Sequence, residues 1–171
     1  MRTIQVVPYN PMWKNEFEKE AKQLEGILGE ECVKIHHIGS TSIPGMSAKP
    51  IIDILIEARD LHEIDKKNNQ FHELGYEPRG EFGIPNRRYF PKGGDERTHH
   101  VHIFPTGHEE VMRHIAFRDY LIEHPCDAER YANVKIELAY KYKTNPYKYV
   151  EGKDSLIKEI EGKAKRWYLE K

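Results

Sequence analysis

Residues 36–55 read HHIGSTSIPGMSAKPIIDIL, and this stretch decides the fold. The run from Pro50 to Ala58 is almost continuously apolar and rich in isoleucine, which is typical of a central strand covered on both faces. Asp53 interrupts that run, and a buried carboxylate is costly unless it is paired or bound to a ligand. The sequence therefore poses a choice for Asp53 between a structural role and a role in a catalytic site.

A Gly-Ser turn precedes this strand. Val33 to Ile38 is predicted to be a strand, and Gly39, Ser40, Thr41 and Ser42 follow it. Glycine lets backbone N–H groups approach an anion, and the hydroxyls add further donors, so these four residues are candidates for binding phosphate. For an isolated Gly-Ser pair an ordinary polar turn is the better explanation, and the spacing of a P-loop is missing.

Lys49 is a further candidate for binding phosphate. Pro50 restricts the residue before it to an extended conformation, which could aim the Lys49 ammonium toward an anion at the turn. A solvated lysine at the entrance of the strand is the alternative.

Helices and strands are predicted on both sides of this stretch. A helix begins at Asn10-Pro11, carries an apolar stripe from Trp13 to Leu28 and ends at Gly29. A second helix is predicted from Asp60 to Gly75. Strands are predicted over residues 2–7, 76–82, 87–91 and 98–104, with a hairpin turn over 92–95.

The last third of the chain is predicted to be helical. Thr106 and Glu109 have the spacing of a capping box, Asp127 is expected to open the next helix, and an apolar stripe from Leu156 to Trp167 marks the last. The whole pattern predicts one domain over residues 1–171, of the α+β (α/β) class, with a mixed β-sheet flanked by helices and a helical C-terminal part.

Composition restricts the partners. The chain has 171 residues, and 27 Lys+Arg nearly balance 28 Asp+Glu, which makes a nucleic-acid partner unlikely. The two cysteines, Cys32 and Cys126, predict no disulfide framework. Neither a signal peptide nor a membrane span is predicted, so we expect a cytoplasmic protein with no membrane partner.

Two histidines can join Asp53. His100 and His102 alternate on a predicted strand, so both side chains lie on one face while Val101 and Ile103 enter the core. If that strand neighbours the Asp53 strand, the three side chains converge, and two histidines with a carboxylate are a common metal-binding set. The alternative is a solvated or anion-facing surface without metal. His37 is a further candidate.

A Gly-Ser turn followed by an acid on the next strand is the pattern of nucleotidyltransferases. The motifs HIGSTSIPG (37–45), KPIID (49–53) and THHVH (98–102) resemble those of the GrpB family, whose fold is similar to that superfamily, and the resemblance covers nearly the whole chain. It implies that phosphates bind at Gly39 and Ser40 and that Asp53 is catalytic. It also implies a divalent metal (Mg, Mn or Zn) on Asp53, with help from His100 or His102. Leu55 departs from the superfamily pattern, which has a second acid at that position.

Basic and aromatic residues farther along complete the predicted site. Arg87 and Arg88 point to opposite faces of their strand, and Arg88 is chosen as the one that faces the ligand. Arg118 on a later helix is added, together with Tyr131 and Lys135, which lie one helical turn apart. For most residues of this segment, solvated lysines and core tyrosines are the better explanation.

Three functions follow from these residues. The first is a nucleotidyltransferase-like enzyme that binds a nucleotide or a nucleotide-bearing coenzyme and transfers a phosphoryl or nucleotidyl group. The second is a non-catalytic binding module for such a ligand, with a decayed metal site, and Leu55 favours it. The third is a metal-dependent hydrolase that uses Asp53 with His100 and His102.

Overall fold

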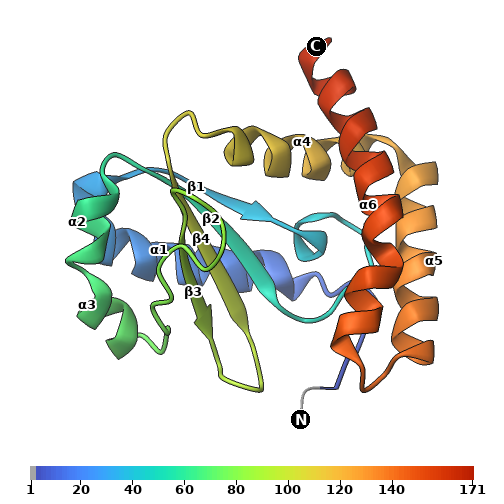
Figure 1. Cartoon of the computed structure of the whole chain (residues 1–171), viewed down its shortest axis with the longest axis horizontal. Coiled ribbons are helices and arrows are strands. Elements are labelled where there is room, and N and C mark those ends of the chain that lie inside the picture. Colours follow the sequence, from blue (N-terminus) through green and yellow to red (C-terminus); the bar gives the residue numbers. More distant parts are fainter. Residues whose placement is uncertain (1–2) are drawn as a thin grey trace.

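The computed structural model describes residues 3–171 and places a four-stranded mixed sheet among helices (Figure 1). The strand order is β1-β2-β4-β3. The strands are β1 (Cys32–Ile38), β2 (Ile52–Ala58), β3 (Arg88–Lys92) and β4 (His99–Pro105). The α-helices of the described residues are α1 (Met12–Leu28), α2 (Leu61–Asp65), α3 (Asn68–Glu73), α4 (Glu109–Glu123), α5 (Pro125–Lys141) and α6 (Pro146–Leu169). This arrangement confirms the predicted α+β class.

The two central strands run parallel. β2 pairs with β4 in parallel, while β1 on β2 and β3 on β4 are antiparallel at the two edges. A parallel pair needs a long crossover, and the segment that contains α2, α3 and β3 supplies it.

Alternation along β2 separates two environments. Ile52, Ile54 and Ile56 are buried in the main hydrophobic core together with α1, α2 and α3. Asp53, Leu55 and Glu57 alternate with these isoleucines and therefore face the other side of the sheet. The two acidic residues of β2, Asp53 and Glu57, thus lie opposite the main core.

Helix α4 and the C-terminal helices cover that second side. Val111 of α4 packs on Leu55 and Phe104, and a separate apolar cluster joins α4, α5 and α6. Figure 1 shows α5 and α6 packed side by side beyond one end of the sheet. Their side chains can therefore reach the end of β2 where Asp53 lies.

The predicted strand over residues 76–82 is wrong. Tyr76 forms only an isolated bridge with Lys92, although Glu77 and Arg79 still donate backbone hydrogen bonds to β3. Gly80 and Phe82 have φ values of 59° and 46°, which no strand tolerates.

Three helix boundaries also differ from the prediction. The helix expected from Asp60 to Gly75 is two short ones, because Lys66 and Lys67 form a turn between α2 and α3. His108 rather than Thr106 caps α4, because its Nδ1 atom accepts a hydrogen bond from the Glu110 N–H. Gly107, between Thr106 and His108, has a φ of 87° and lies outside the helix. α5 begins at Pro125, two residues before the predicted Asp127.

The N-terminal strand predicted over residues 2–7 lies partly outside the described residues. Within residues 3–7, Val7 forms an isolated antiparallel bridge with Ala48. In the described part of the chain, no helix is long and apolar enough to cross a membrane.

Candidate functional site

The parallel pairing of β2 with β4 brings Asp53 to the histidines. Asp53 is in register with His100 and Leu55 with His102, so all four side chains share one face. The Asp53 Oδ1 atom lies 3.2 Å from His100 Nδ1 and 3.7 Å from His102 Nε2. The predicted convergence of these three side chains is therefore present.

Asp53 is held as a carboxylate by this arrangement. Burial alone would raise its pKa, but the hydrogen bonds and charges of His100 and His102 hold the pKa well below the ordinary range. The His100 Nε2 atom, on the far side of that ring, is buried and has no hydrogen-bond partner among the described residues. Asp53 and His100 thus form an oriented carboxylate–imidazole pair.

The residues around Asp53 do not make a set of metal ligands. Among the described residues, no group of three or more His, Cys, Asp or Glu side chains is arranged to hold a metal ion. Leu55, at the position of the superfamily's second acid, is completely buried against Ile38, Phe104 and Val111. Glu57, the next acid on this face, is bound to His36 at 2.7 Å. The predicted Mg, Mn or Zn site stays a prediction for which this donor set gives no support.

Gly39 lets the backbone of the turn lie close to the Asp53 side chain. Its φ of 72° belongs to a region that favours glycine, and a Cβ there would lie 2.6 Å from Asp53 Oδ2. Only glycine therefore lets the strand end turn so tightly. Ser40 follows directly and begins a 3-10 turn over Ser40–Ser42.

Lys135 reaches this turn from the middle of α5. It is only 2% exposed, and its Nζ atom donates to Ser40 Oγ at 2.7 Å and to the Ser47 carbonyl oxygen at 2.6 Å. Its ammonium also lies over the ring of Tyr131, 4.5 Å from the centroid. Burial, followed by the charges of Lys153 and Lys49, lowers the pKa of Lys135 to about 7.

Two further lysines and a tyrosine close the site from other elements. The Nζ atoms of Lys49 and Lys153 lie 5.2 and 4.6 Å from the centroid of the Tyr149 ring. Burial and the charge of Lys49 lower the pKa of Lys153 to about 8. Tyr149 is 1% exposed, and its hydroxyl has no hydrogen-bond partner among the described residues.

Tyr149 and Lys153 were not among the predicted site residues. Their spacing was the available signal, because residues four apart lie on one face of a helix. Nothing local in the sequence places that face of α6 against the turn after β1.

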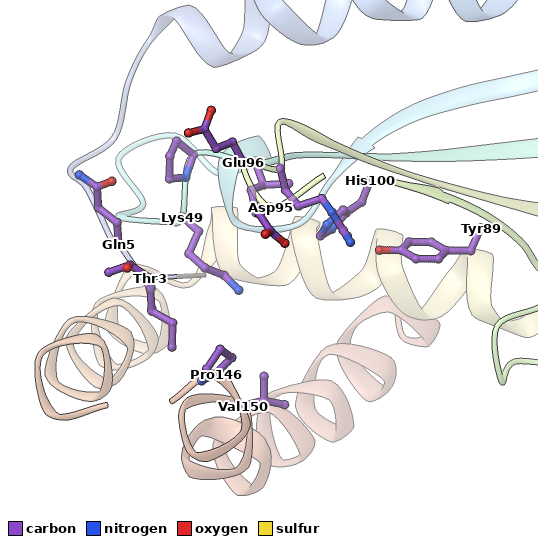
Figure 2. Close-up of a pocket in the computed structure, with 13 residues that line it drawn as sticks. Thr3, Gln5, Lys49, Tyr89, Asp95, Glu96, His100, Pro146 and Val150 are labelled. Carbon is purple, nitrogen blue, oxygen red and sulfur yellow. The ribbon is translucent and has the colours of Figure 1, made fainter. Parts of the chain in front are cut away.

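These residues line two adjoining cavities. The smaller, of about 190 Å³, is lined by residues from the Gly-Ser turn, β2, β4, α4, α5 and α6: Gly39, Ser40, Thr41, Ala48, Lys49, Ile51, Asp53, His100, Phe117, Tyr131, Lys135, Tyr149 and Lys153. The larger, of about 670 Å³, shares Lys49, Ile51 and His100 with it. Figure 2 shows Lys49, His100 and Tyr89 directed into the larger cavity, with Pro146 and Val150 across from them.

Charge distinguishes the smaller cavity. Its lining in the described chain holds three lysines and a single carboxylate, that of Asp53. This excess of buried positive charge suits an anionic ligand.

Three predicted residues lie elsewhere, beside α1. Ser42, His37 and Arg118 line a separate depression. His37 points to the core side of β1, stacks on Phe17 at 4.7 Å and has its pKa lowered to about 4 by burial. Arg118 donates to the His37 carbonyl oxygen at 3.1 Å, and so ties α4 to β1.

Arg88 is not brought to the site either. Its guanidinium is paired with Asp65 of α2, at 2.6 Å. The neighbouring Arg87 lies on the Asp53 side instead, where its Nη1 atom is 3.4 Å from His102 Nδ1. The two arginines thus point to opposite sides, as predicted, and the structure brings Arg87 rather than Arg88 to the Asp53 side.

His114 of α4 was not among the predicted site residues, and it lies beside His102 with the ring centroids 6.0 Å apart. Burial lowers the pKa of His114 to about 3, so its ring is neutral. No local pattern marks it, because a lone histidine on a helix is usually structural.

Fold and site together define a mixed α+β protein with a lysine-rich, candidate anion-binding cavity at the end of the central strand that carries Asp53. The family model "GrpB protein" matches residues 3–163, so the chain belongs to the GrpB family.

Relatives and a solved structure agree with this assignment. The chain is 47% identical over 166 residues to the UPF0157 protein YqkA of Bacillus subtilis, covering 97% of this chain but 48% of that one. It is 36% identical to the glutamate-rich protein GrpB of Alkalihalophilus pseudofirmus, covering 91% of this chain and 92% of the relative. The crystal structure of the conserved protein GrpB from Enterococcus faecalis superposes with a TM-score of 0.94 at 44% identity, covering 96% and 99% of the two chains.

Proposed function

We propose that this protein binds a nucleotide or a nucleotide-bearing coenzyme by its phosphate groups. The observation that carries the proposal is the cluster of Lys49, Lys135 and Lys153 around one cavity that offers a single carboxylate. Burial and the charges of neighbouring lysines lower the pKa values of Lys135 and Lys153, so their charged forms are disfavoured in the empty cavity and a bound phosphate chain would stabilise them.

The polar groups of the cavity support the same ligand. Ser40 lines the cavity. The buried Tyr149 hydroxyl has no hydrogen-bond partner among the described residues, and a phosphate oxygen would accept its hydrogen bond. The smaller cavity has room for phosphate groups, and the adjoining 670 Å³ lies in the size range of pockets for small organic ligands, which suits a nucleoside.

Calorimetry on the full chain tests the proposal. ATP, ADP and pyrophosphate are titrated in EDTA, and adenosine serves as the ligand without phosphate. We expect the three phosphate compounds to bind in about the micromolar range without added metal, and adenosine to bind far more weakly. Failure of all three to bind the folded protein, with or without Mg²⁺, would contradict the proposal.

The affinity is expected to depend on pH in a defined direction. The pKa values of about 7 for Lys135 and about 8 for Lys153 mean that both amines lose protons as the pH rises from 7 to 9. A bound phosphate chain favours the charged amines, so affinity falls across this window, by up to about tenfold per pH unit for each proton taken up. The terminal phosphate of ATP ionises near pH 6 and is constant in charge above it. An affinity for ATP that is flat or rising over this window would contradict the assignment.

Phosphoryl or nucleotidyl transfer is a second candidate function, and the Asp53–His100 pair favours it. His100 lines both cavities, and Asp53 orients its ring, so the pair lies where a phosphate chain in the smaller cavity would meet an acceptor hydroxyl in the larger one.

Asp53→Asn tests this second function. We expect turnover of ATP with a hydroxyl acceptor to fall by about 10²–10⁴-fold, because the ring loses its orienting carboxylate, while ATP still binds. Turnover equal to that of the native protein would exclude the role of the pair. A native protein that binds ATP and never turns it over would favour the binding module.

A further inference from the structure

The hydroxyl of Ser40 and the amine of Lys135 form a close pair that anion binding alone does not require. Ser40 follows the left-handed Gly39 at the end of β1, and its Oγ atom lies 2.7 Å from Lys135 Nζ. A lysine that only neutralises phosphate is usually solvated before the ligand arrives. Lys135 is instead buried and positioned by the Ser47 carbonyl oxygen at 2.6 Å.

The surroundings of Lys135 make its neutral amine accessible near neutral pH. The charged and titratable groups of the cavity are Lys49 before β2, Asp53 of β2, His100 of β4, Tyr149 and Lys153 of α6, and Tyr131 on its own helix. Burial and the two lysines outweigh the carboxylate and lower the pKa of Lys135 to about 7. A neutral amine can donate one N–H to the Ser47 carbonyl and turn its lone pair toward the Ser40 hydroxyl.

Ser40 is distinct from the two hydroxyls that follow it. The Thr41 hydroxyl is hydrogen-bonded to His37 Nε2 at 2.9 Å, and Ser42 Oγ donates to the Gly39 carbonyl oxygen at 2.5 Å. Neither contact involves an amine that could remove a proton.

We propose that Ser40 is a nucleophile activated by Lys135 and that it attacks a phosphoric ester or anhydride bound in the smaller cavity. The choice of a phosphorus electrophile rests on the proposed function; the nucleophile–base pair itself does not.

The step balances without any further reactant. The Ser40 Oγ–P bond forms and the bond from phosphorus to the leaving oxygen breaks, while the Ser40 proton passes to Lys135 Nζ and then to the leaving oxygen. A water or an acceptor hydroxyl next attacks the phosphoserine, and Ser40 recovers its proton through Lys135.

A fluorophosphonate probe tests the pair on the full chain. The hydroxyl displaces fluoride from phosphorus, so intact mass and tandem mass spectrometry report the modified residue. We expect labelling at Ser40 that speeds up as the pH rises through about 7. Ser40→Ala abolishes it, and Lys135→Met slows it about 100-fold or more. Lys135→Arg also slows it, because arginine cannot become neutral.

Ser155→Ala is the control, because it removes an exposed serine of α6 and is expected to leave labelling of Ser40 at the native rate. Thermal melts establish that each variant is folded. A folded native protein that is not labelled at Ser40, or a rate that Lys135→Met leaves unchanged, would overturn the pair. Nucleotide binding without Ser40 labelling contradicts this inference alone, and Ser40 labelling without nucleotide binding contradicts the proposed function alone.

Discussion

Lys135→Met is expected to weaken nucleotide binding about 30-fold or more and, at the same time, to raise the thermal stability of the unliganded protein. The loss follows because Lys135 is buried in the cavity proposed to hold the phosphates, and removing one partner of a buried charged contact costs about 2–5 kcal/mol. The gain follows because the empty protein buries this amine beside Lys49 and Lys153. A methionine of similar length relieves that cost by about 1–2 kcal/mol, or about 2–8 °C in Tm.

The gain in stability depends on pH with a definite sign. The pKa of Lys135 is about 7 in the folded protein against an ordinary 10.5. The unfolded chain therefore binds more protons between these values, and the native free energy of unfolding rises with pH across that window. The advantage of methionine is largest at or below about pH 7 and shrinks above it.

Melting curves and calorimetry on one preparation measure both effects. Lys158→Met is the matched control, since Lys158 lies on the surface of α6 in an ion pair with Asp154 at 2.9 Å and should change neither quantity much. A Lys135→Met protein that binds ATP normally, or that melts well below the native protein at about pH 6, contradicts the role given to Lys135.

Gly39→Ala is expected to destabilise the protein by about 2–4 kcal/mol and to abolish nucleotide binding. The left-handed φ costs about 1–3 kcal/mol for a residue with a side chain, and the new Cβ would lie 2.6 Å from Asp53 Oδ2. To relieve that contact the turn must move away from β2, and the Ser40 hydroxyl moves with it. Chemical denaturation and ATP titration measure the two effects.

Gly45→Ala separates backbone strain from displacement of the site. Gly45 also has a positive φ, of 81°, but a Cβ there would meet no atom within 4 Å. We expect a smaller loss of stability and native affinity for ATP. If both variants bind ATP as the native protein does, the turn at Gly39 does not form the phosphate site.

Much of the fold was predictable from local patterns. In α1, β2 and β4 the spacing of apolar residues along the sequence indicates which side chains are buried. All three elements form as predicted. The placement of Asp53 beside His100 was predicted from the alternation of side chains along each of the two strands and from the assumption that the strands are neighbours. The structure pairs these two residues. The segment over 76–82 misled because its left-handed residues include Phe82, which gives no sign of that conformation in the sequence.

The predicted site was incomplete because some of its residues are brought together only by contacts between distant segments of the chain. Lys153 and Tyr149 join the cavity only because α6 packs across α5, and Arg88 leaves it only because Asp65 stands nearby on α2. Leu55 is the clearest case. Leu55 packs against Phe104 and Val111, so an apolar core residue occupies the position where the superfamily has a second acid. Glu57 does not replace that acid, because it is bound to His36.

The most direct test of the lysine cavity is a crystal structure of the full chain with ATP bound in the presence of EDTA. The phosphate chain is predicted to lie within hydrogen-bonding distance of Ser40 Oγ and the Lys135 and Lys153 ammonium groups, with the nucleoside in the larger cavity. Phosphates bound away from these three residues, or a smaller cavity that stays empty while ATP binds at another surface, would contradict the account.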